Sequence, residues 1–364
     1  MPPTVVIVGG GYGGVAAARA LDDETDVILV EPRDAFVHNV AALRGLVDPA
    51  WTDRIFMPYH RLLDRGQVIR DRVVAADVKG VTLGSGEKVA ADYLVLATGS
   101  AYPFPGKTGE DESAVARSRL RAGREALEEA AAVLLLGAGP VGLELAGEIK
   151  SAWPDRAVTI VDPVADVLSG DYPPEFRAEL RRQLAELGID LVLGAFLREE
   201  PPYEAGRAKT FTVTTRAGRR ITADIWFRCY GVTPSTGYLT GERGGELGTA
   251  RRASGYLAVT PELRLPGHRH VFAIGDITSL PEGKLASAAG RQARVVAENI
   301  RALIAGSGEL TRYEPGPPAV SVPLGPSGGA SYLPGTGVLG ATETARIKGE
   351  DLRVGTYAEF FRLG

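Results

Sequence analysis

The stretch TVVIVGGGYGGVAAARAL, residues 4–21, decides the fold of this chain. Its β-branched run, glycine cluster and alanine-rich run are typical of a buried parallel strand, a tight loop and a helix. A second strand-like run, VILV, ends directly before Glu31. Gly9, Gly11 and Gly14 have the spacing that lets a backbone approach a pyrophosphate at a helix N-terminus, while the acid accepts hydrogen bonds from ribose hydroxyls. The stretch therefore predicts a dinucleotide-binding unit.

The same plan recurs in the second third of the chain. AVLLL leads into GAGPVGLE, a helical pattern, the strand-like run VTIV and then Asp162, so that Gly137, Gly139 and Gly142 repeat the glycine spacing. ADYLVLATG (91–99) and ADIWFRCYG (223–231) also share their first two residues and their final glycine, and each follows a hairpin-like stretch. We interpret these as two homologous dinucleotide-binding units, each with a parallel sheet, an inserted antiparallel meander and a last strand whose glycine-ended loop closes over the nucleotide.

Two further segments follow the second unit. VFAIGD, residues 271–276, has the pattern of a buried strand and precedes a helical pattern that begins near Leu285. From about Thr311 the chain is rich in Pro and Gly, but hydrophobic residues recur to its end. We therefore expect this last segment to form a small folded unit rather than a disordered tail.

The composition excludes several classes of function. The 364 residues suffice for two or three domains, and a net charge of -4 with scattered arginines predicts no nucleic-acid partner. No apolar run approaches a membrane span and Pro2 stands where a myristoylation signal needs glycine, so we expect a cytoplasmic protein with at most peripheral membrane contact. The single cysteine, Cys229, excludes an intrachain disulfide, a dithiol redox centre and a multi-cysteine metal site, and no metal site is predicted. The sequence leaves a homodimer open.

The double glycine fingerprint, ATG (97–99), Gly231 three residues before a proline and AIGD (273–276) together resemble the two-dinucleotide flavoprotein family. That resemblance implies an α/β fold with two Rossmann-like dinucleotide-binding domains, as in glutathione reductase, and a small C-terminal α+β unit. It places FAD in a discontinuous domain of residues 1–115 and 256–310, and NAD(P)H in residues 116–255. Residues 311–364 would form the acceptor-side, interface domain. Asp276 would contact the ribityl or pyrophosphate part of FAD.

Three longer stretches narrow the resemblance. FVHNVAALRGLV (36–47), ATGSAYPFPGK (97–107) and VGLELAGEIKSAWPD (141–155) are similar to the ferroptosis-suppressor quinone reductases, which are apoptosis-inducing-factor-like flavoproteins, and then to type II NADH dehydrogenases. The resemblance implies an FAD-dependent NAD(P)H:quinone oxidoreductase that passes a hydride from NADH to FAD and two electrons to a quinone. Two alternatives are a reductase of a ferredoxin or rubredoxin, and an NADH-sensing flavoprotein without turnover. Arg353, where the animal members have an aromatic residue, departs from the pattern.

By the same resemblance, three residues are candidates for catalysis, and each has a structural alternative. His38 would lie near the flavin and orient or protonate a quinone oxygen, or else be packed in the core. Glu144 would approach the nicotinamide side, or else only complement the helix dipole. Lys348 would stabilise negative charge on the acceptor side, or else be a solvated surface lysine.

Arg44 would hold FAD phosphate or ribose, with a surface ion pair to Asp48 as the alternative. NADH is expected over NADPH, because the Asp162 carboxylate would repel a 2′-phosphate unless Arg182 or another arginine neutralised it. The complete set of residues expected to bind the cofactors is Gly9, Gly10, Gly11, Tyr12, Gly13, Gly14, Glu31, Pro32, Arg33, His38, Asn39, Arg44, Val73, Ala97, Thr98, Gly99, Gly137, Gly139, Pro140, Val141, Gly142, Glu144, Asp162, Gly231, Gly275, Asp276, Leu285 and Ala286.

Overall fold

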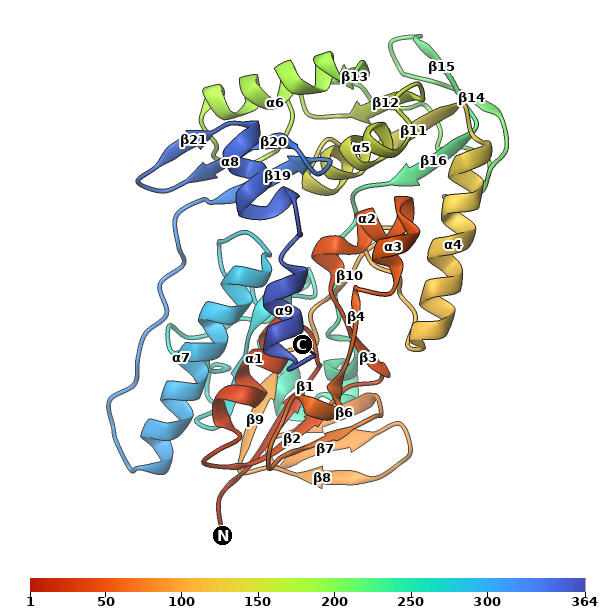
Figure 1. Cartoon of the computed structure of the whole chain (residues 1–364). Coiled ribbons are helices and arrows are strands. Elements are labelled where there is room, and N and C mark those ends of the chain that lie inside the picture. Colours follow the sequence, from red (N-terminus) through yellow and green to blue (C-terminus); the bar gives the residue numbers. More distant parts are fainter. Residues whose placement is uncertain (364) are drawn as a thin grey trace.

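A five-stranded parallel sheet organises the N-terminal part of the computed structural model, which describes residues 1–363 (Figure 1). The strands lie in the order β18 (Val271–Ala273), β9 (Tyr93–Leu96), β1 (Thr4–Val8), β2 (Asp26–Val30) and β5 (Gln67–Ile69). The runs TVVIV, VILV and VFA are strands, as the sequence predicts. The sheet brings together distant segments of the chain, because β18 pairs with β9 in parallel register, with Val271 opposite Leu94.

The two faces of this sheet are covered differently. Val5 and Ile7 pack toward the helices α1 (Tyr12–Leu21) and α7 (Ala286–Ile304), which lie side by side. Val6 and Val8 pack toward the antiparallel sheet of β6 (Val73–Asp77), β7 (Gly80–Leu83) and β8 (Lys88–Ala90) and toward the 3-10 turns η3 (Gly237–Leu239) and η5 (Gly245–Ala250); the turn η4 (Gly241–Arg243) between them buries no residue. A strand buried on both faces needs an unbroken apolar sequence, which is why TVVIV has no polar alternation.

A second parallel sheet repeats the arrangement, with strands in the order β13 (Ile189–Leu193), β12 (Ala157–Asp162), β11 (Ala132–Leu136) and β16 (Ile225–Arg228). Val133 and Leu135 face the main core, in which helices α5 (Pro140–Ala152) and α6 (Pro174–Glu186) also bury residues. Leu134 and Leu136 face the hairpin of β14 (Phe211–Thr214) and β15 (Arg220–Ala223). The chain thus has a mixed α/β fold with parallel, Rossmann-like sheets.

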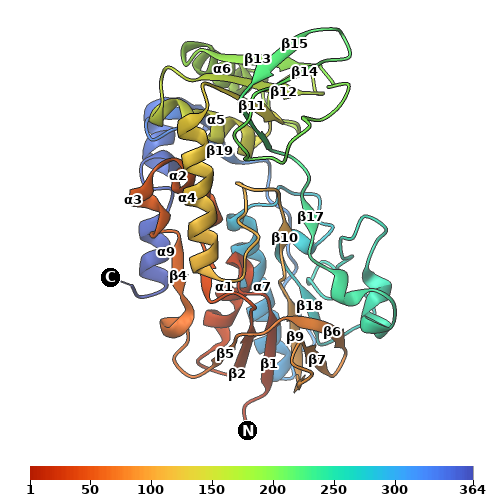
Figure 2. The same cartoon turned by 90° about the vertical axis from the view of Figure 1, so that its right-hand side faces the viewer.

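Several elements connect the two sheets. Strand β10 (Ser100–Ala101) pairs with β17 (Thr233–Pro234), and Figure 2 shows helix α4 (Ser113–Glu129) running lengthwise between the two parts. Residues 35–61 add a small lobe under the second sheet. Its elements are β3 (Ala35–Val37), η1 (Asn39–Ala41), α2 (Ala42–Val47), α3 (Pro49–Thr52), β4 (Phe56–Pro58) and η2 (Tyr59–Arg61).

The C-terminal segment is folded, as its recurring hydrophobic residues predict. It contains an antiparallel sheet of β19 (Val320–Leu324), β20 (Gly328–Leu333) and β21 (Gly337–Leu339), followed by α8 (Ala341–Thr344), the π-helical turn η7 (Ala345–Gly349) and α9 (Val354–Phe360). Strand β19 packs directly on α5, where a Cβ on Gly147 would lie 2.4 Å from the Leu324 Cα. Helix α9 then returns to lie beside α1, where the Tyr357 and Tyr12 ring centroids are 5.2 Å apart (Figure 1). Within residues 1–363, no helix combines the length and the apolar character needed to cross a membrane.

Candidate active site

The glycine loop after β1 combines two tight contacts with one open position. Gly9 has φ +101°, and a Cβ there would lie 2.6 Å from the Ala97 carbonyl oxygen. A Cβ on Gly14 would lie only 1.8 Å from the Gly9 oxygen, which explains why helix α1 can pack so closely on the strand. A Cβ on Gly11, in contrast, would meet no heavy atom within 4 Å. The middle glycine therefore borders free space at the helix N-terminus, where the fingerprint places a pyrophosphate.

The second loop repeats this arrangement. A Cβ on Gly137, which has φ +116°, would lie 2.8 Å from the Cys229 oxygen, and a Cβ on Gly142 would lie 1.9 Å from the Gly137 oxygen. The middle glycine, Gly139, again has no heavy atom within 4 Å of its Cβ position. Gly11 and Gly139 are the N-caps of α1 and α5 and give no side-chain cap, so the free N-terminal amides of both helices face the open space; in α5 they begin at Val141, because Pro140 has no N–H. Both loops thus fit a dinucleotide pyrophosphate.

The acids at the ends of β2 and β12 hold these loops in place. Glu31 is buried, and its Oε2 accepts from the Gly10 N–H at 2.5 Å. Asp162 has the equivalent contact, because its Oδ2 accepts from the Ala138 N–H at 2.6 Å. Tyr59, which was not among the predicted site residues, donates a hydrogen bond from its hydroxyl to the Gly10 oxygen at 2.8 Å. Each carboxylate therefore lies beside its glycine loop, where a ribose would follow the pyrophosphate.

A lysine that the sequence did not identify lies against Asp276. The Ser100 hydroxyl donates to Asp276 Oδ2 at 2.5 Å, and the Lys107 ammonium lies 3.5 Å from the same oxygen. Lys107 also donates to the Ser100 carbonyl oxygen at 2.6 Å. Burial lowers the pKa of Lys107, and the nearby Asp276 charge partly opposes that effect. Helix α7 begins at Ala286 with Leu285 as its N-cap, as predicted, and its N-terminus follows this cluster in the chain.

His38 is fully buried and both of its ring nitrogens have partners. Nε2 lies 2.7 Å from the Leu352 carbonyl oxygen, which can only accept, so Nε2 carries the proton. Nδ1 is then the acceptor for the Tyr12 hydroxyl at 3.1 Å, while that hydroxyl accepts from the Val40 N–H at 3.1 Å. Burial lowers the pKa of His38 to about 4. Such a histidine is neutral at pH 7, and these contacts favour the packing alternative over a proton donor.

The depressed pKa of His38 makes the stability of the protein depend on pH. The unfolded state, with a His pKa of 6.5, binds a proton that the folded state rejects down to about pH 4. We expect acidification from pH 7 to pH 5 to lower the free energy of unfolding by about 2 kcal/mol through this group alone. His38→Gln keeps a donor for the Leu352 oxygen and should lose that part of the pH dependence. Urea unfolding at both pH values measures it, and equal pH dependence in both proteins would contradict the assignment.

Arg44 is buried, and its guanidinium is engaged within the chain. Its Nε and Nη2 donate to the Glu148 carboxylate at 3.0 and 2.7 Å, and its Nη1 donates to the Gly349 and Glu350 carbonyl oxygens at 2.6 and 3.1 Å. The alternative of a surface ion pair with Asp48 is wrong, because Asp48 instead accepts from Ala50 N–H as the cap of α3. The role of Arg44 as an FAD ligand stays a prediction. It is disfavoured because Nε, Nη1 and Nη2 already donate to groups of the chain.

The other two candidates for catalysis contact each other. Lys348, in the π-helical turn, donates to Glu144 Oε1 at 2.7 Å and to the Ser321 oxygen at 3.2 Å. Glu144 lies in the second turn of α5, directly after the Gly139 loop. Burial raises the pKa of Glu144, and the Lys348 charge opposes this rise. The structure therefore joins an acid beside the second dinucleotide loop to an ammonium of the C-terminal segment, and Lys348 is not a solvated surface lysine.

Glu148 was not predicted as a site residue, although the sequence contains a signal that it is buried beside Glu144. Glu144 and Glu148 are four residues apart on α5, so they lie on the same face of a helix that is otherwise apolar there. Two buried acids on one helix face require cations, and Lys348 and Arg44 supply them. In residues 1–363, no group of three or more His, Cys, Asp or Glu side chains is arranged to hold a metal ion.

The remaining predicted site residues lie on several elements, and their roles stay predictions. Thr98 donates to the Ser235 oxygen at 2.7 Å, and Gly99, with φ +66°, precedes β10. Gly231, with φ +100°, follows the buried Cys229. Val73 begins β6 and Asn39 begins η1. The others belong to the glycine loops or follow a parallel strand: Gly13, Pro32, Arg33, Ala97, Pro140, Val141 and Gly275.

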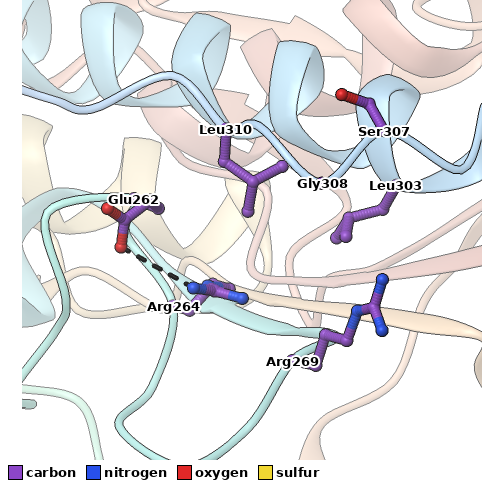
Figure 3. Close-up of a pocket in the computed structure, with 7 residues that line it drawn as sticks. All are labelled: Glu262, Arg264, Arg269, Leu303, Ser307, Gly308 and Leu310. Carbon is purple, nitrogen blue, oxygen red and sulfur yellow. Dashed lines mark ion pairs between the residues drawn. The ribbon is translucent and has the colours of Figure 1, made fainter.

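Hollows in the described part of the chain include one beside the candidate site and one away from it. One, of about 510 Å³, borders the Arg44–Glu148 pair and is also lined by Trp51, Arg124 and Trp153. The other, of about 320 Å³, is lined by Glu262, Arg264, Arg269, Leu303, Ser307, Gly308 and Leu310 (Figure 3). None of the predicted site residues lines the second hollow, so it does not belong to the candidate active site.

Comparison with known proteins adds a family and a fold. A family model described as pyridine nucleotide-disulphide oxidoreductase matches residues 3–293. Ferroptosis suppressor protein 1 of Homo sapiens is 31% identical over 358 residues, which cover 97% of this chain and 94% of that protein. The sulfide:quinone oxidoreductase of Aquifex aeolicus has a similar structure, with a TM-score of 0.75 at 17% identity, covering 99% of this chain and 92% of that one. NDH2 from Plasmodium falciparum in complex with NADH gives a TM-score of 0.74 at 13% identity, covering 95% and 93%.

Proposed function

The chain belongs to the pyridine nucleotide-disulphide oxidoreductase family, and from that premise we propose that it oxidises NADH and delivers the electrons to a quinone. It is an FAD-dependent NAD(P)H oxidoreductase. The reaction would convert NADH, a proton and a quinone into NAD⁺ and a quinol. FAD, when bound, accepts the hydride and gives up two electrons to the acceptor.

The proposal assigns the two glycine loops to the two cofactors. Residues 1–115 and 256–310 would form the FAD-binding domain, in which the Gly11 loop, Glu31 and Asp276 bind FAD. Residues 116–255 would form the NADH-binding domain around the Gly139 loop and Asp162, with residues 311–364 closing the acceptor side. The open Cβ positions at Gly11 and Gly139 support both assignments.

Disulfide chemistry does not fit this member of the family. The chain has a single cysteine, Cys229, which is buried, and burial raises the pKa of its thiol to about 12. A thiol needs its thiolate form to attack a disulfide, and it needs a partner thiol to complete the exchange. The electrons must therefore leave by another route, which is the reason for proposing a small acceptor.

The Lys348–Glu144 pair is the observation that carries the quinone proposal. A quinone gains two electrons and two protons, so negative charge develops on its oxygens during reduction. Lys348 lies on the C-terminal segment and is partly exposed, with 19% of its side-chain surface accessible. Its ammonium can stabilise that oxygen charge, while Glu144 fixes its position from the side of the second loop. The similarity to ferroptosis suppressor protein 1 over nearly the whole chain supports the same acceptor class.

A stepwise experiment tests this function. The purified protein is reduced anaerobically with NADH and then mixed with short-chain and long-chain quinones, a ferredoxin or a rubredoxin, while flavin absorbance is followed. We expect quinones to reoxidise the protein fastest. Faster reoxidation by a protein carrier would replace the quinone proposal with a carrier reductase, and slow reoxidation by all of them would indicate an NADH sensor.

Nucleotide preference provides a separate prediction at Asp162. Its carboxylate ends β12 beside the second loop, and Arg182 cannot readily neutralise a 2′-phosphate because it pairs with Glu179 and Glu186 on α6. We expect a higher kcat/KM with NADH than with NADPH, and Asp162→Ser should shift that ratio toward NADPH by about tenfold by removing like-charge repulsion.

Steady-state kinetics with both nucleotides measures the ratio. Asp190→Ser is the matched control, because Asp190 is an exposed acid of the neighbouring strand β13 that pairs with Arg219. The control should keep the ratio of the unmodified protein. A preference of the unmodified protein for NADPH would refute the argument from Asp162.

A further inference from the structure

Arg44 lies where three parts of the chain meet. It belongs to α2, its carboxylate partner Glu148 belongs to α5, and its two carbonyl acceptors, Gly349 and Glu350, belong to the C-terminal segment. Its side chain is 3% exposed, and its guanidinium stacks 4.8 Å from the Trp51 ring centroid. A planar guanidinium offers donors in fixed directions, so these contacts define the position of each part relative to the others.

We propose that Arg44 is a positioning residue that holds the π-helical turn Ala345–Gly349 so that Lys348 reaches Glu144. The proposal rests on the acceptor-side role of Lys348 proposed above. The Arg44 Nη1 contacts fall on the two residues directly after Lys348, and no contact links Arg44 to Lys348 itself. Arg44 therefore acts through the backbone of the segment and not on the reacting groups.

The conformation of the segment shows why it needs such a support. A π-helical turn is rare and is usually found where function demands it. It is followed by Leu352 and Arg353, which have φ of +49° and +64°. Residues other than glycine adopt this left-handed backbone conformation only when their surroundings impose it. Two buried groups of the first part contact this segment at its carbonyls: Arg44 before the bend and His38 at Leu352.

Arg44 also favours the Lys348–Glu144 contact through its charge. Glu144 and Glu148 lie one helical turn apart on α5, and burial raises the pKa of both. With Arg44 on Glu148, Lys348 is free to pair with Glu144. Without Arg44, Glu148 would be a buried carboxylate that competes for the same ammonium.

The test uses a variant that avoids leaving a buried charge unpaired. In R44M/E148Q both members of the ion pair are replaced by neutral side chains of similar size, so the protein should fold, but the Gly349 and Glu350 oxygens lose their donor. Limited acetylation with acetic anhydride, read by mass spectrometry, reports the accessibility of each lysine. We expect Lys348 to be acetylated about fivefold faster in R44M/E148Q, because loss of buried contacts opens a segment locally. Exposed Lys79 and Lys88 should not change.

Arg124→Met is the matched control. Arg124 lines the same hollow, but its hydrogen bond, its ion pair and its ring contact are with Val47, Glu128 and Trp153 and not with the C-terminal segment. Its replacement should leave Lys348 acetylation and turnover unchanged. Unchanged Lys348 acetylation in a folded R44M/E148Q protein would overturn the proposal.

Kinetics of the two half-reactions then separates this proposal from the proposed function. R44M/E148Q should slow reoxidation by a short-chain quinone about tenfold, as expected for misplacing one charge-stabilising group, while reduction by NADH stays within about twofold. Adding Lys348→Met to that variant should slow it no further, and additive losses would overturn the proposal. If Lys348→Met alone reoxidises normally while R44M/E148Q still exposes Lys348, the acceptor role of Lys348 fails and the positioning role of Arg44 stands.

Discussion

Gly11→Val should yield a folded protein that is colourless. A Cβ at this position meets no heavy atom of the chain within 4 Å, so valine causes no clash in the fold itself. Its methyl groups would occupy the space between the first amides of α1 and a pyrophosphate. Losing two charge-assisted hydrogen bonds costs about 3–6 kcal/mol, which lowers FAD affinity by more than about a hundredfold.

Absorbance of the purified variant near the flavin bands and FAD content after denaturation measure the result. Far-ultraviolet circular dichroism shows that the fold is retained. The contrasting variant is Gly14→Ala, whose Cβ would lie 1.8 Å from the Gly9 oxygen and should destabilise the fold rather than only the FAD site. A yellow Gly11→Val protein with full FAD content would mean that the first loop does not bind FAD.

The parts of the fold that sequence predicts well are those with local causes. Strand β1, the glycine loop and α1 are contiguous, and each requires residue types that are recognisable on their own: β-branched residues for a strand buried on both faces, glycines where backbones touch. The same holds for β11 and α5, and also for the start of α7 at Ala286. The acids Glu31 and Asp162 follow from the same local pattern.

The charged contacts of the site depend on distant pairs, and no periodicity in the sequence encodes them. Lys348 and Glu144 are 204 positions apart, and Arg44 and Glu148 are 104 apart. The resemblance carried by FVHNVAALRGLV predicted Arg44 as a ligand of FAD phosphate or ribose. Its actual partner became visible only once α2 lay against α5. The two acids on α5 were the one local clue that buried cations were needed.

The role of His38 also depends on residues that are distant in the sequence. Its surroundings in FVHNVAAL allow either a packed or a reactive imidazole. The choice is made by the Leu352 carbonyl oxygen, which is 314 positions away and accepts a hydrogen bond from Nε2–H, and by the Tyr357 ring, whose centroid lies 4.7 Å from that of the imidazole. Burial among these groups, and not the local sequence, holds the imidazole neutral at pH 7.

Gly139→Val should give a yellow protein that NADH reduces only at much higher concentrations than it does the unmodified protein. The second loop copies the first, with an open Cβ position at the N-cap of α5, so valine there should spare the fold and block the NADH pyrophosphate. Pro140 follows and has no amide hydrogen, so this loop offers fewer donors than the first and depends more on close backbone approach. We expect the apparent KM for NADH to rise by more than about a hundredfold, with flavin content unchanged.

Reduction by dithionite provides the control, since it needs no nucleotide site. The variant should be bleached by dithionite, and then reoxidised by a quinone at the rate of the unmodified protein, because Lys348 and Glu144 keep their contact. Opposite results for Gly11→Val and Gly139→Val, one colourless and one yellow but poorly reduced by NADH, would assign each loop to its own cofactor. Loss of flavin from Gly139→Val would show instead that the second loop supports FAD binding. The assignment of the first loop to FAD and the second to NADH would then be wrong.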